Sequence, residues 1–330
     1  MAGGTLDPRY TTLSPSDVHA WSELTNLLAR VDGTEEFYGP DDLAEELNEP
    51  GFSASLDSVA VWAGDQLVGY GQLRVGDRLT GGLAKATIDG GVHPVHRGRG
   101  IGQRIMDRLE PRAVALAAER HPGVPLALDL WAGPAGSGAG RLAAARGYAP
   151  ARYFTDMRVE LEGDGTGPED ADPPVDEPGL EDFRPDLAEA VRRAHNEAFA
   201  DHWGSVPRSE EKWADQLASR SFRPALSKVV LSTDSSLDPA ERVDAYALCN
   251  EWVPGELYVS LVGTRRRARR RGLAALLLGG VVRSAARSGY RMVDLTVDSE
   301  SPTGAGRIYE RVGFNPVRTS TVYQRLFGEG

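Results

Sequence analysis

A basic loop containing glycine is the part of this sequence best suited to bind a ligand. Six of the seven residues Arg265–Arg271 are arginines, and Gly272 follows them. The run Leu257–Val262 before the loop is apolar and β-branched, which is typical of a buried strand, and the apolar run from Leu273 is typical of a helix. Helix starts have unpaired N–H groups and partial positive charge, and guanidinium groups add donors suited to phosphate. The sequence therefore predicts a site for a phosphorylated cofactor.

A second copy of this construction occurs earlier in the chain. The run Gly90–Pro94 precedes a loop at Val95–Gly102, and both loops have the spacing Arg-x-x-Gly-x-Gly/Ala. The motif residues are Arg97, Gly100 and Gly102 in the first copy, and Arg269, Gly272 and Ala274 in the second. A single arginine run would equally indicate a solvated basic patch, a nucleic-acid contact or a localisation signal. The repetition favours a cofactor loop.

The composition narrows the class of protein. A length of 330 residues suits two domains of about 150 residues each. The net charge of −11 argues against nucleic acid as a partner, because phosphate contacts need a basic surface. No apolar run is long enough to span a bilayer, and Met1–Gly4 lacks the segments of a secretory signal. The single cysteine, Cys249, allows no internal disulfide, so the sequence predicts a cytoplasmic protein, and we expect this thiol to be buried and inert. The six histidines lack ligand spacing, so no metal site is predicted.

The elements that position the two loops also occur twice. Residues 137–148 resemble residues 303–314, and each stretch follows its loop at nearly the same distance. Residues 162–177 contain seven acids and no basic residue, which is typical of a linker. We therefore predict domains at 1–161 and 179–330, joined by a linker at 162–178, with a last strand or hairpin in the first half and a last strand pair in the second. The fold class is α+β, with two copies of a mixed sheet flanked by helices.

The loop motif, together with the later stretch Leu295–Phe314, resembles the GNAT N-acetyltransferase superfamily. The resemblance covers both halves, so the chain is similar to a tandem GNAT protein. The two-domain arrangement and the motif His195–Phe199 also resemble the mycothiol synthase-like acetyltransferases of actinobacteria. The resemblance implies mostly antiparallel sheets with a splayed central strand pair, and acetyl transfer from acetyl-CoA to the primary amine of a small molecule by direct attack. It is consistent with a monomer or a homodimer.

The resemblance also implies roles for particular residues. Tyr309 occupies the position of the general acid that protonates the departing CoA thiolate, whereas Ala143 stands at that position in the first half. We therefore expect catalysis in the second domain and a non-catalytic first domain. The implied cofactor contacts of the second half are Leu261, Val262, Gly263, Arg269, Arg270, Arg271, Gly272, Leu273, Ala274 and Ser301. Those of the first half are Val92, Arg97, Gly98, Arg99, Gly100, Ile101 and Gly102.

The general base and the acceptor contacts are less specified by the sequence. Glu256 and Glu251 near the start of the main strand are candidates for the base, and the alternative is that both solvate a turn. His202 and Trp203 are candidate acceptor contacts, and the alternative for Trp203 is a hydrophobic staple. For Tyr309 the alternative is a helix tyrosine packed under the sheet. At the level of the whole chain, the alternative to an enzyme is a non-catalytic acetyl-CoA-binding or regulatory tandem GNAT protein.

Overall fold

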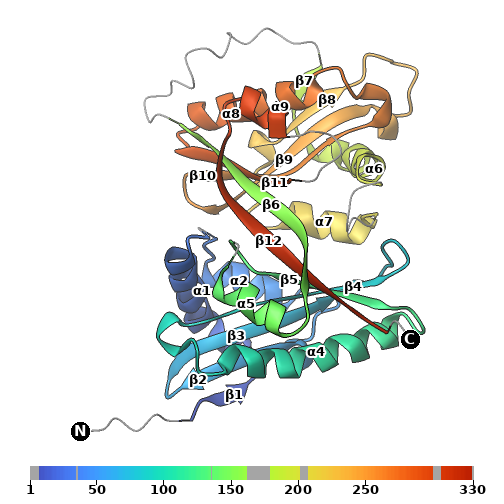
Figure 1. Cartoon of the computed structure of the whole chain (residues 1–330). Helices are drawn as coiled ribbons and strands as arrows, with labels where there is room; N and C mark the ends of the chain where they lie inside the picture. Colours follow the sequence, from blue (N-terminus) through green and yellow to red (C-terminus); the bar gives the residue numbers. More distant parts are fainter. Residues whose placement is uncertain are drawn as a thin grey trace. The chain divides into compact units, whose positions relative to one another are not determined.

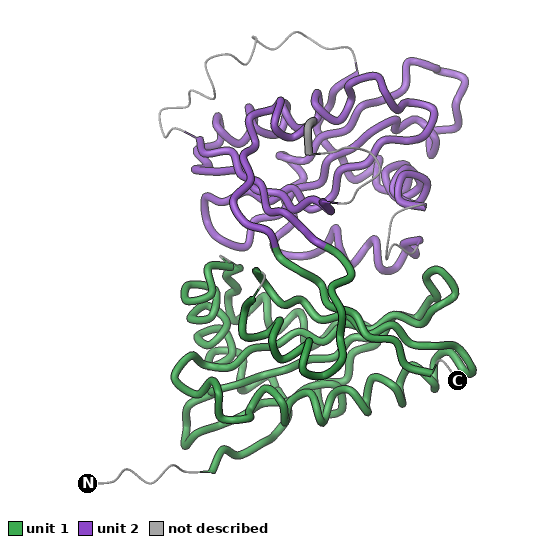
Figure 2. Tube along the Cα trace, in the orientation of Figure 1, with its two compact units in different colours: residues 1–152, 320–330 green, residues 153–319 purple. Residues whose placement is uncertain are grey.

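The structure, a computed structural model, describes residues 7–34, 36–134, 136–161, 179–200, 207–299 and 306–328. The chain divides into two compact units, which Figure 2 colours separately. Unit 1 comprises residues 1–152 and 320–330, and unit 2 comprises residues 153–319. This division differs from the boundaries at 161 and 179 that the sequence predicts, and the predicted linker at 162–178 lies outside the described residues.

Unit 1 is a sheet with helices on both faces. Its strand order is β1-β2-β3-β4-β5-β12, and β4 and β5 are its parallel pair. Helices α4 and α5 pack on one face, and α1 and α2 pack on the other. Its elements are β1 (Arg9–Thr11), η1 (Pro15–Asp17), α1 (Val18–Asp32), α2 (Pro40–Leu47), α3 (Ala54–Asp57), β2 (Ser58–Ala63), β3 (Gln66–Val75), β4 (Ala84–Val92), η2 (Pro94–His96), α4 (Ile101–Arg120), β5 (Leu126–Trp131), α5 (Gly138–Ala145) and the end of β12 (Asn315–Phe327).

Unit 2 repeats this architecture. Its strand order is β6-β11-β10-β9-β8-β7, with β10 and β11 parallel. Helices α8 and α9 pack on one face, and α6 and α7 pack on the other. Its elements are most of β6 (Ala149–Glu160), β7 (Leu180–Asp182), η3 (Pro185–Leu187), α6 (Ala188–Ala198), α7 (Glu210–Ala218), η4 (Pro224–Leu226), β8 (Lys228–Leu231), η5 (Pro239–Glu241), β9 (Val243–Val253), β10 (Glu256–Thr264), η6 (Arg266–Ala268), α8 (Leu273–Arg287), β11 (Met292–Asp298) and α9 (Gly306–Arg311).

The two halves of the chain exchange their last strands. Residues Phe154–Glu160 of β6 pair with β11 in unit 2, and residues Val322–Phe327 of β12 pair with β5 in unit 1. Figure 1 shows this as the green β6 beside β11 and the red β12 beside β5. The predicted last strand pair of the second half is therefore wrong, because residues 315–327 form one long strand. Alternating apolar residues specify which face a strand buries, and they do not specify its partner.

The parallel pair of each unit separates toward the loop. The pairing of β4 with β5 ends at Ile88 and Leu130, although β4 continues to Val92. The pairing of β10 with β11 ends at Tyr258 and Asp294, although β10 continues to Thr264. We call the unpaired stretch of each pair the splay. It confirms the splayed central strand pair expected for each domain.

Candidate functional site

The loops that follow β4 and β10 have nearly the same backbone conformation. In unit 1, Gly98 and Gly100 have φ values of +73° and +79°. In unit 2, Arg270 and Gly272 occupy the same two places with φ values of +63° and +77°. Gly100 and Gly272 are the N-caps of α4 and α8, and neither makes a side-chain cap hydrogen bond. Each loop therefore presents uncapped backbone N–H groups at a helix start, which suits a diphosphate.

Arg270 differs from the other arginines of its loop. It is the only non-glycine residue with a positive φ among the described residues. Such a conformation costs a non-glycine residue about 1 kcal/mol, and strain of this kind concentrates at ligand-binding sites. Arg270 is exposed, and its guanidinium makes no hydrogen bond or ion pair with the part of the chain that the structure describes. It is the arginine best placed to reach an anion held by the loop.

Much of the remaining charge of the run is neutralised within unit 2. Arg265 is 3% exposed, and its guanidinium lies 2.7 Å from Glu197 and 2.6 Å from Glu241. Arg267 and Arg271 both pair with the buried carboxylate of Asp244, at 2.9 Å and 3.4 Å. Three of the six arginines are therefore ion-paired with carboxylates of unit 2, which reduces the net positive charge of the run.

The first arginine of each motif braces its loop. Arg97 Nε donates to the carbonyl oxygen of Val92 at 2.9 Å, and its two terminal nitrogens bind Asp32 of α1 at 2.8 Å and 2.6 Å. Arg269 reaches the carbonyl oxygens of Thr264 and, at the end of α6, Ala198. These contacts explain the arginine at this position without a ligand. Cofactor contacts of the two side chains stay predictions.

Other predicted cofactor residues contribute packing as well as backbone. The side chains of Ile101 and Leu273 lie in the cores beside α4 and α8, so their backbone N–H groups are the parts that could meet a ligand. A Cβ on Gly102 would lie 3.1 Å from Leu142 of α5. A Cβ on Gly263 would lie 2.5 Å from the Tyr246 ring, so this glycine is required by packing.

The motif His195–Phe199 belongs to the core of unit 2. His195 is 3% exposed, its Nδ1 lies 2.7 Å from Tyr246 Oη, and its ring stacks on Phe199 at 4.7 Å. Burial, with a smaller effect of Arg208, lowers the pKa of His195 to about 4. Cys249 is also buried, as predicted, and burial raises the pKa of its thiol to about 12. Neither group is a nucleophile or base at neutral pH.

The splay of unit 2 offers an unpaired strand edge. Beyond Tyr258, the backbone groups of β10 that point toward β11 lack a β11 partner, and Leu261 and Val262 lie on this stretch. A β-bulge falls between Val259 and Leu261, so Ser260 is the extra residue relative to β9. In unit 1, β3 and β4 pair without a register shift up to Val92. An amide-containing chain could hydrogen-bond to the open edge of β10.

Tyr309 lies on α9 and packs against the core beside α8. Its ring meets that of Phe314 edge-on, with centroids 6.3 Å apart. Burial raises the pKa of its phenol, so the group is protonated at neutral pH. Its hydroxyl has no hydrogen-bond partner among the described residues. At the corresponding place in unit 1, Ala143 is 0% exposed, and the hydroxyl of Tyr148 instead donates to Glu110 at 3.0 Å.

The two carboxylates singled out by the sequence have different surroundings. Glu251 accepts hydrogen bonds from Arg223 at 2.7 Å, Tyr290 at 2.7 Å and the Gly255 N–H at 3.0 Å. Burial alone would raise the pKa of Glu251, but these hydrogen bonds together lower it. Glu256 pairs with Arg291 at 3.1 Å. Glu251 is therefore a structural node that closes the β9–β10 turn, and its low basicity does not suit a general base.

Three predicted residues, His202, Trp203 and Ser301, lie outside the described residues. Among the residues that are described, no group of three or more His, Cys, Asp and Glu side chains is arranged to hold a metal ion. No helix in the same ranges is long and apolar enough to cross a membrane.

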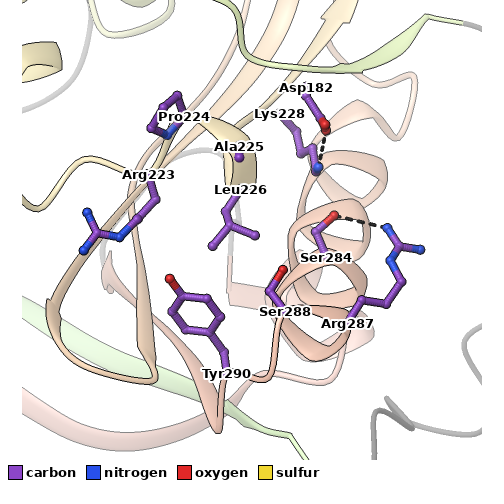
Figure 3. Close-up of a pocket in the computed structure, with 10 residues that line it drawn as sticks. All are labelled: Asp182, Arg223, Pro224, Ala225, Leu226, Lys228, Ser284, Arg287, Ser288 and Tyr290. Carbon is purple, nitrogen blue, oxygen red and sulfur yellow. Dashed lines mark hydrogen bonds and ion pairs between the residues drawn. The ribbon is translucent and has the colours of Figure 1, made fainter.

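A cavity of about 450 Å³ lies in unit 2, away from the loop (Figure 3). Its lining includes Leu226, Lys228, Ser288 and Tyr290, at the C-terminal end of α8. The loop lies at the other end of this helix of 15 residues, roughly 22 Å away along the axis. Lys228 pairs with Asp182 across the cavity wall. No pattern in the sequence indicates this cavity, and none of the predicted site residues lines it.

Comparison with known protein families identifies the class of protein to which the chain belongs. The family model "Acetyltransferase (GNAT) family" matches residues 21–124, and the model "Acetyltransferase (GNAT) domain" matches residues 245–326. The first range contains strand β4 and its loop, and the second contains the splayed strands β10 and β11 with their loop. The chain is thus an acetyltransferase with one GNAT domain in each half.

Full-length relatives and solved structures agree with this class. Mycothiol acetyltransferase from Thermobispora bispora is 31% identical over 322 residues, covering 94% of this chain and 97% of the relative. The enzyme of the same name from Streptomyces avermitilis is 29% identical and covers 98% and 96%. A GCN5-related N-acetyltransferase from Sphaerobacter thermophilus superposes with a TM-score of 0.72 at 27% identity, covering 97% and 95% of the two chains. A tandem GNAT protein from the clavulanic acid biosynthesis pathway has a TM-score of 0.66 at 20% identity, with 97% and 98% covered.

The chain therefore belongs to the GNAT acetyltransferase family, with two GNAT domains in tandem, and it is an N-acetyltransferase that uses acetyl-CoA. The structure fits this cofactor, because each unit combines an uncapped helix start with a splayed strand pair. Acetyl-CoA supplies an acyl thioester that is already activated toward attack by an amine.

Proposed function

We propose that the chain transfers an acetyl group from acetyl-CoA to the primary amine of a small molecule, and that catalysis takes place in unit 2. The observation that carries the proposal is the difference between Tyr309 and Ala143. Tyr309 has a phenol that is protonated at neutral pH, whereas its counterpart in unit 1 is only a buried methyl group. A protein of this kind is expected in the cytoplasm as a monomer or a homodimer.

The residues of unit 2 have distinct roles in this proposal. The backbone N–H groups of residues 270–274 and the guanidinium of Arg270 bind the diphosphate. The open edge of β10 at Leu261 and Val262 binds the amide-containing arm and holds the thioester at the splay. Tyr309 donates its phenolic proton to the leaving sulfur as the C–S bond breaks, which spares the site a free thiolate. The names of the mycothiol acetyltransferase relatives support a small-molecule acceptor.

Unit 1 retains the loop and lacks the acid. Its loop torsions match those of unit 2, which supports binding of acetyl-CoA there without turnover. We therefore infer that unit 1 is the non-catalytic part of the chain, with a structural or regulatory role. Two acetyl-CoA sites per chain, of which one is productive, is the stoichiometry that this proposal predicts.

The test is Tyr309→Phe. We expect kcat to fall at least 100-fold, because general acid catalysis typically contributes 10²–10⁴-fold, while the Kd for acetyl-CoA stays unchanged in calorimetry. Thiol release is measured with a panel of glucosamine, lysine and kanamycin, and the fastest acceptor is kept for later work. Tyr153→Phe, at a tyrosine that is 40% exposed, is the matched control. An unchanged kcat in Tyr309→Phe would remove the assigned acid, and no thiol release with any of the amines would overturn the proposed class of acceptor.

A further inference from the structure

A chain of three hydrogen-bonded side chains crosses the sheet of unit 2 where the splay begins. Tyr258 of β10 donates its phenolic proton to Thr296 Oγ1 at 2.9 Å. Thr296 of β11 in turn donates to Asp156 Oδ1 of β6 at 2.6 Å. Asp156 is also ion-paired with Arg318. Three neighbouring strands therefore contribute one connected network of a phenol, an alcohol and a carboxylate.

The network faces away from α8. Leu257, Leu295 and Met157 belong to the core beside α8, so alternation along the strands places Tyr258, Thr296 and Asp156 on the opposite face. All three network residues are partly exposed. Tyr258 is also the last residue of β10 that pairs with β11. The network thus begins where the open edge of β10 begins, on a face that α8 and Tyr309 do not cover.

The direction of the hydrogen bonds has a chemical consequence. A tyrosine hydroxyl has one proton, and that of Tyr258 is directed to Thr296. Toward any further partner, the Tyr258 oxygen can act only as an acceptor. An ammonium group on this face would therefore donate to Tyr258, and the carboxylate of Asp156 lies at the far end of the network as the final proton acceptor.

We propose that Tyr258, Thr296 and Asp156 form a relay that takes a proton from the acceptor ammonium before it attacks the thioester. This inference rests on the proposed function of unit 2. The ammonium N–H bond breaks as a Tyr258 O–H bond forms, the former Tyr258 proton passes to Thr296, and the former Thr296 proton passes to Asp156, which becomes a carboxylic acid. The neutral amine then forms the C–N bond, the C–S bond breaks, and sulfur takes the Tyr309 proton.

The remaining protons return through solvent. The new amide nitrogen loses its second proton, which restores the phenol of Tyr309, and Asp156 releases its proton after the products leave. One ammonium and one thioester therefore become one amide, one thiol and one released proton. No oxidant or other co-reactant is needed.

The surroundings of the other carboxylates support this assignment. Glu251 accepts three hydrogen bonds within the β9–β10 turn, whereas Asp156 is connected through Thr296 to Tyr258 at the start of the splay. Asp156 comes from the first half of the sequence and reaches unit 2 through the exchanged strand β6. The catalytic site of unit 2 is therefore incomplete without a residue from the other half of the chain.

Unit 1 cannot build the same relay. Thr87 and Asp129 pair in unit 1 as Tyr258 and Asp294 pair in unit 2. Trp131, two residues further along β5, corresponds to Thr296 of β11. Its partner on β12 is Val322, whereas the partner of Thr296 on β6 is Asp156. The relay is thus absent from the same unit that lacks the tyrosine acid.

The relay is tested with Asp156→Asn and Tyr258→Phe in the full chain, assayed with the fastest amine of the panel. We expect kcat/KM for the amine to fall at least 100-fold at pH 7, with the Kd for acetyl-CoA unchanged. The loss should shrink as the pH rises, because a larger fraction of the amine is then already neutral. This pH-dependent recovery is a readout that a purely structural role of Asp156 would not produce.

The control is Asp294→Asn, at a carboxylate on the same face that binds Arg158 at 2.7 Å and lies outside the relay. It should retain the kcat/KM of the unsubstituted chain, and thermal melting checks the folding of all three variants. Wild-type kcat/KM in both relay variants, with kcat of Tyr309→Phe still reduced at least 100-fold, would overturn the relay and leave the proposed function intact. Wild-type kinetics in Tyr309→Phe as well would overturn both, as would the absence of thiol release with every amine. Equal losses at all pH values would also contradict the relay.

Discussion

The two units share a loop conformation and differ in almost every side chain that could perform chemistry. The positive φ values at Gly98 and Gly100 recur at Arg270 and Gly272. However, Ala143 stands at the place of Tyr309, and the pairing of β3 with β4 in unit 1 has no bulge like the one at Ser260. The comparison teaches that a loop conformation suited to a diphosphate is retained in unit 1 without counterparts of the proposed acid and relay. In our proposal, cofactor binding and turnover are therefore separate properties of the two units.

The faces on which we expect the acceptor also differ between the units. In unit 1, a Cβ on Gly91 would lie 2.3 Å from Leu28 of α1, so α1 packs directly on the end of β4. Asp89 on this stretch has a pKa raised to about 6, mainly by burial, with Arg74 lowering it and Glu46 raising it. Unit 2 instead carries the hydrogen-bonded relay of Tyr258, Thr296 and Asp156 at the start of its splay.

The largest effect on catalysis should come from substituting the positive-φ glycine of each loop in turn. Gly272→Val and Gly100→Val place a β-branched residue at positive φ, where it is strongly disfavoured. In each variant the helix start should lose its alignment with the diphosphate. We expect Gly272→Val to lower kcat/KM at least 100-fold. We expect Gly100→Val to change kcat/KM less than threefold while removing one of the two acetyl-CoA sites. Kinetics and calorimetry on the full chain measure both quantities. Equal kinetic losses in the two variants would contradict the division of roles.

Introducing the missing acid should not convert unit 1 into a catalyst. We expect Ala143→Tyr, combined with Tyr309→Phe, to be as slow as Tyr309→Phe alone, because unit 1 also lacks the relay. Ala143 is fully buried, so the larger side chain should in addition destabilise unit 1 by about 1–3 kcal/mol. Thiol release and chemical denaturation are the measurements. Recovered turnover would mean that the acid alone separates the two units.

His195 should make the stability of unit 2 fall in acid. Its folded-state pKa of about 4 lies below the ordinary value of 6.5, so the unfolded chain binds the proton first. The stabilisation is fully present above pH 6.5 and is lost as the pH falls toward 4, by about 3 kcal/mol. Segment-resolved hydrogen exchange across α6 and β9 at pH 7 and pH 5 measures it. His195→Gln, which does not titrate, should show a smaller difference between the two pH values.

Asp89 should have the opposite effect in unit 1. Its folded-state pKa of about 6 lies above the ordinary value of 3.8, so the unfolded chain ionises first as the pH rises. Stability is therefore lost between about pH 4 and pH 6, by about 2 kcal/mol. Asp89→Asn should stabilise unit 1 at pH 8 and have little effect at pH 4, as followed by hydrogen exchange of β4. A uniform effect at both pH values would assign the change to packing.

The smallest effect should come from Arg270→Gly, which gives the unit 2 loop the residue found at Gly98. Relief of the positive φ is offset by the greater freedom of glycine in the unfolded chain, so we expect stability to change by less than about 0.5 kcal/mol. Loss of the unpaired guanidinium should weaken acetyl-CoA binding by roughly fivefold. Calorimetry against Arg267→Gln, which removes a side chain paired with Asp244, separates the charge at this position from charge in general.

The sequence by itself determined the local parts of this protein. A strand, a basic loop and a helix follow one another without interruption, so the glycine positions and the residue types specify the loop conformations at Gly100 and Gly272. The repeat predicts the doubled fold, and the spacing from the loop to Tyr309 carries the resemblance to the family. These features are readable because backbone torsions and helix starts depend on neighbours within a few residues.

Only the tertiary structure decided which distant residues meet. Alternation in residues 149–160 and 315–327 predicts strands and their buried faces. The backbone of a strand can pair with either sheet, so the exchange of β6 and β12 follows from packing. The exchange brings Asp156 to Thr296 and Val322 to Trp131, so it creates a polar network in one unit and excludes it from the other. The neutralisation of Arg265 by Glu197 and Glu241 is equally non-local. Side-chain chemistry between remote segments depends on three-dimensional register, which a one-dimensional pattern does not contain.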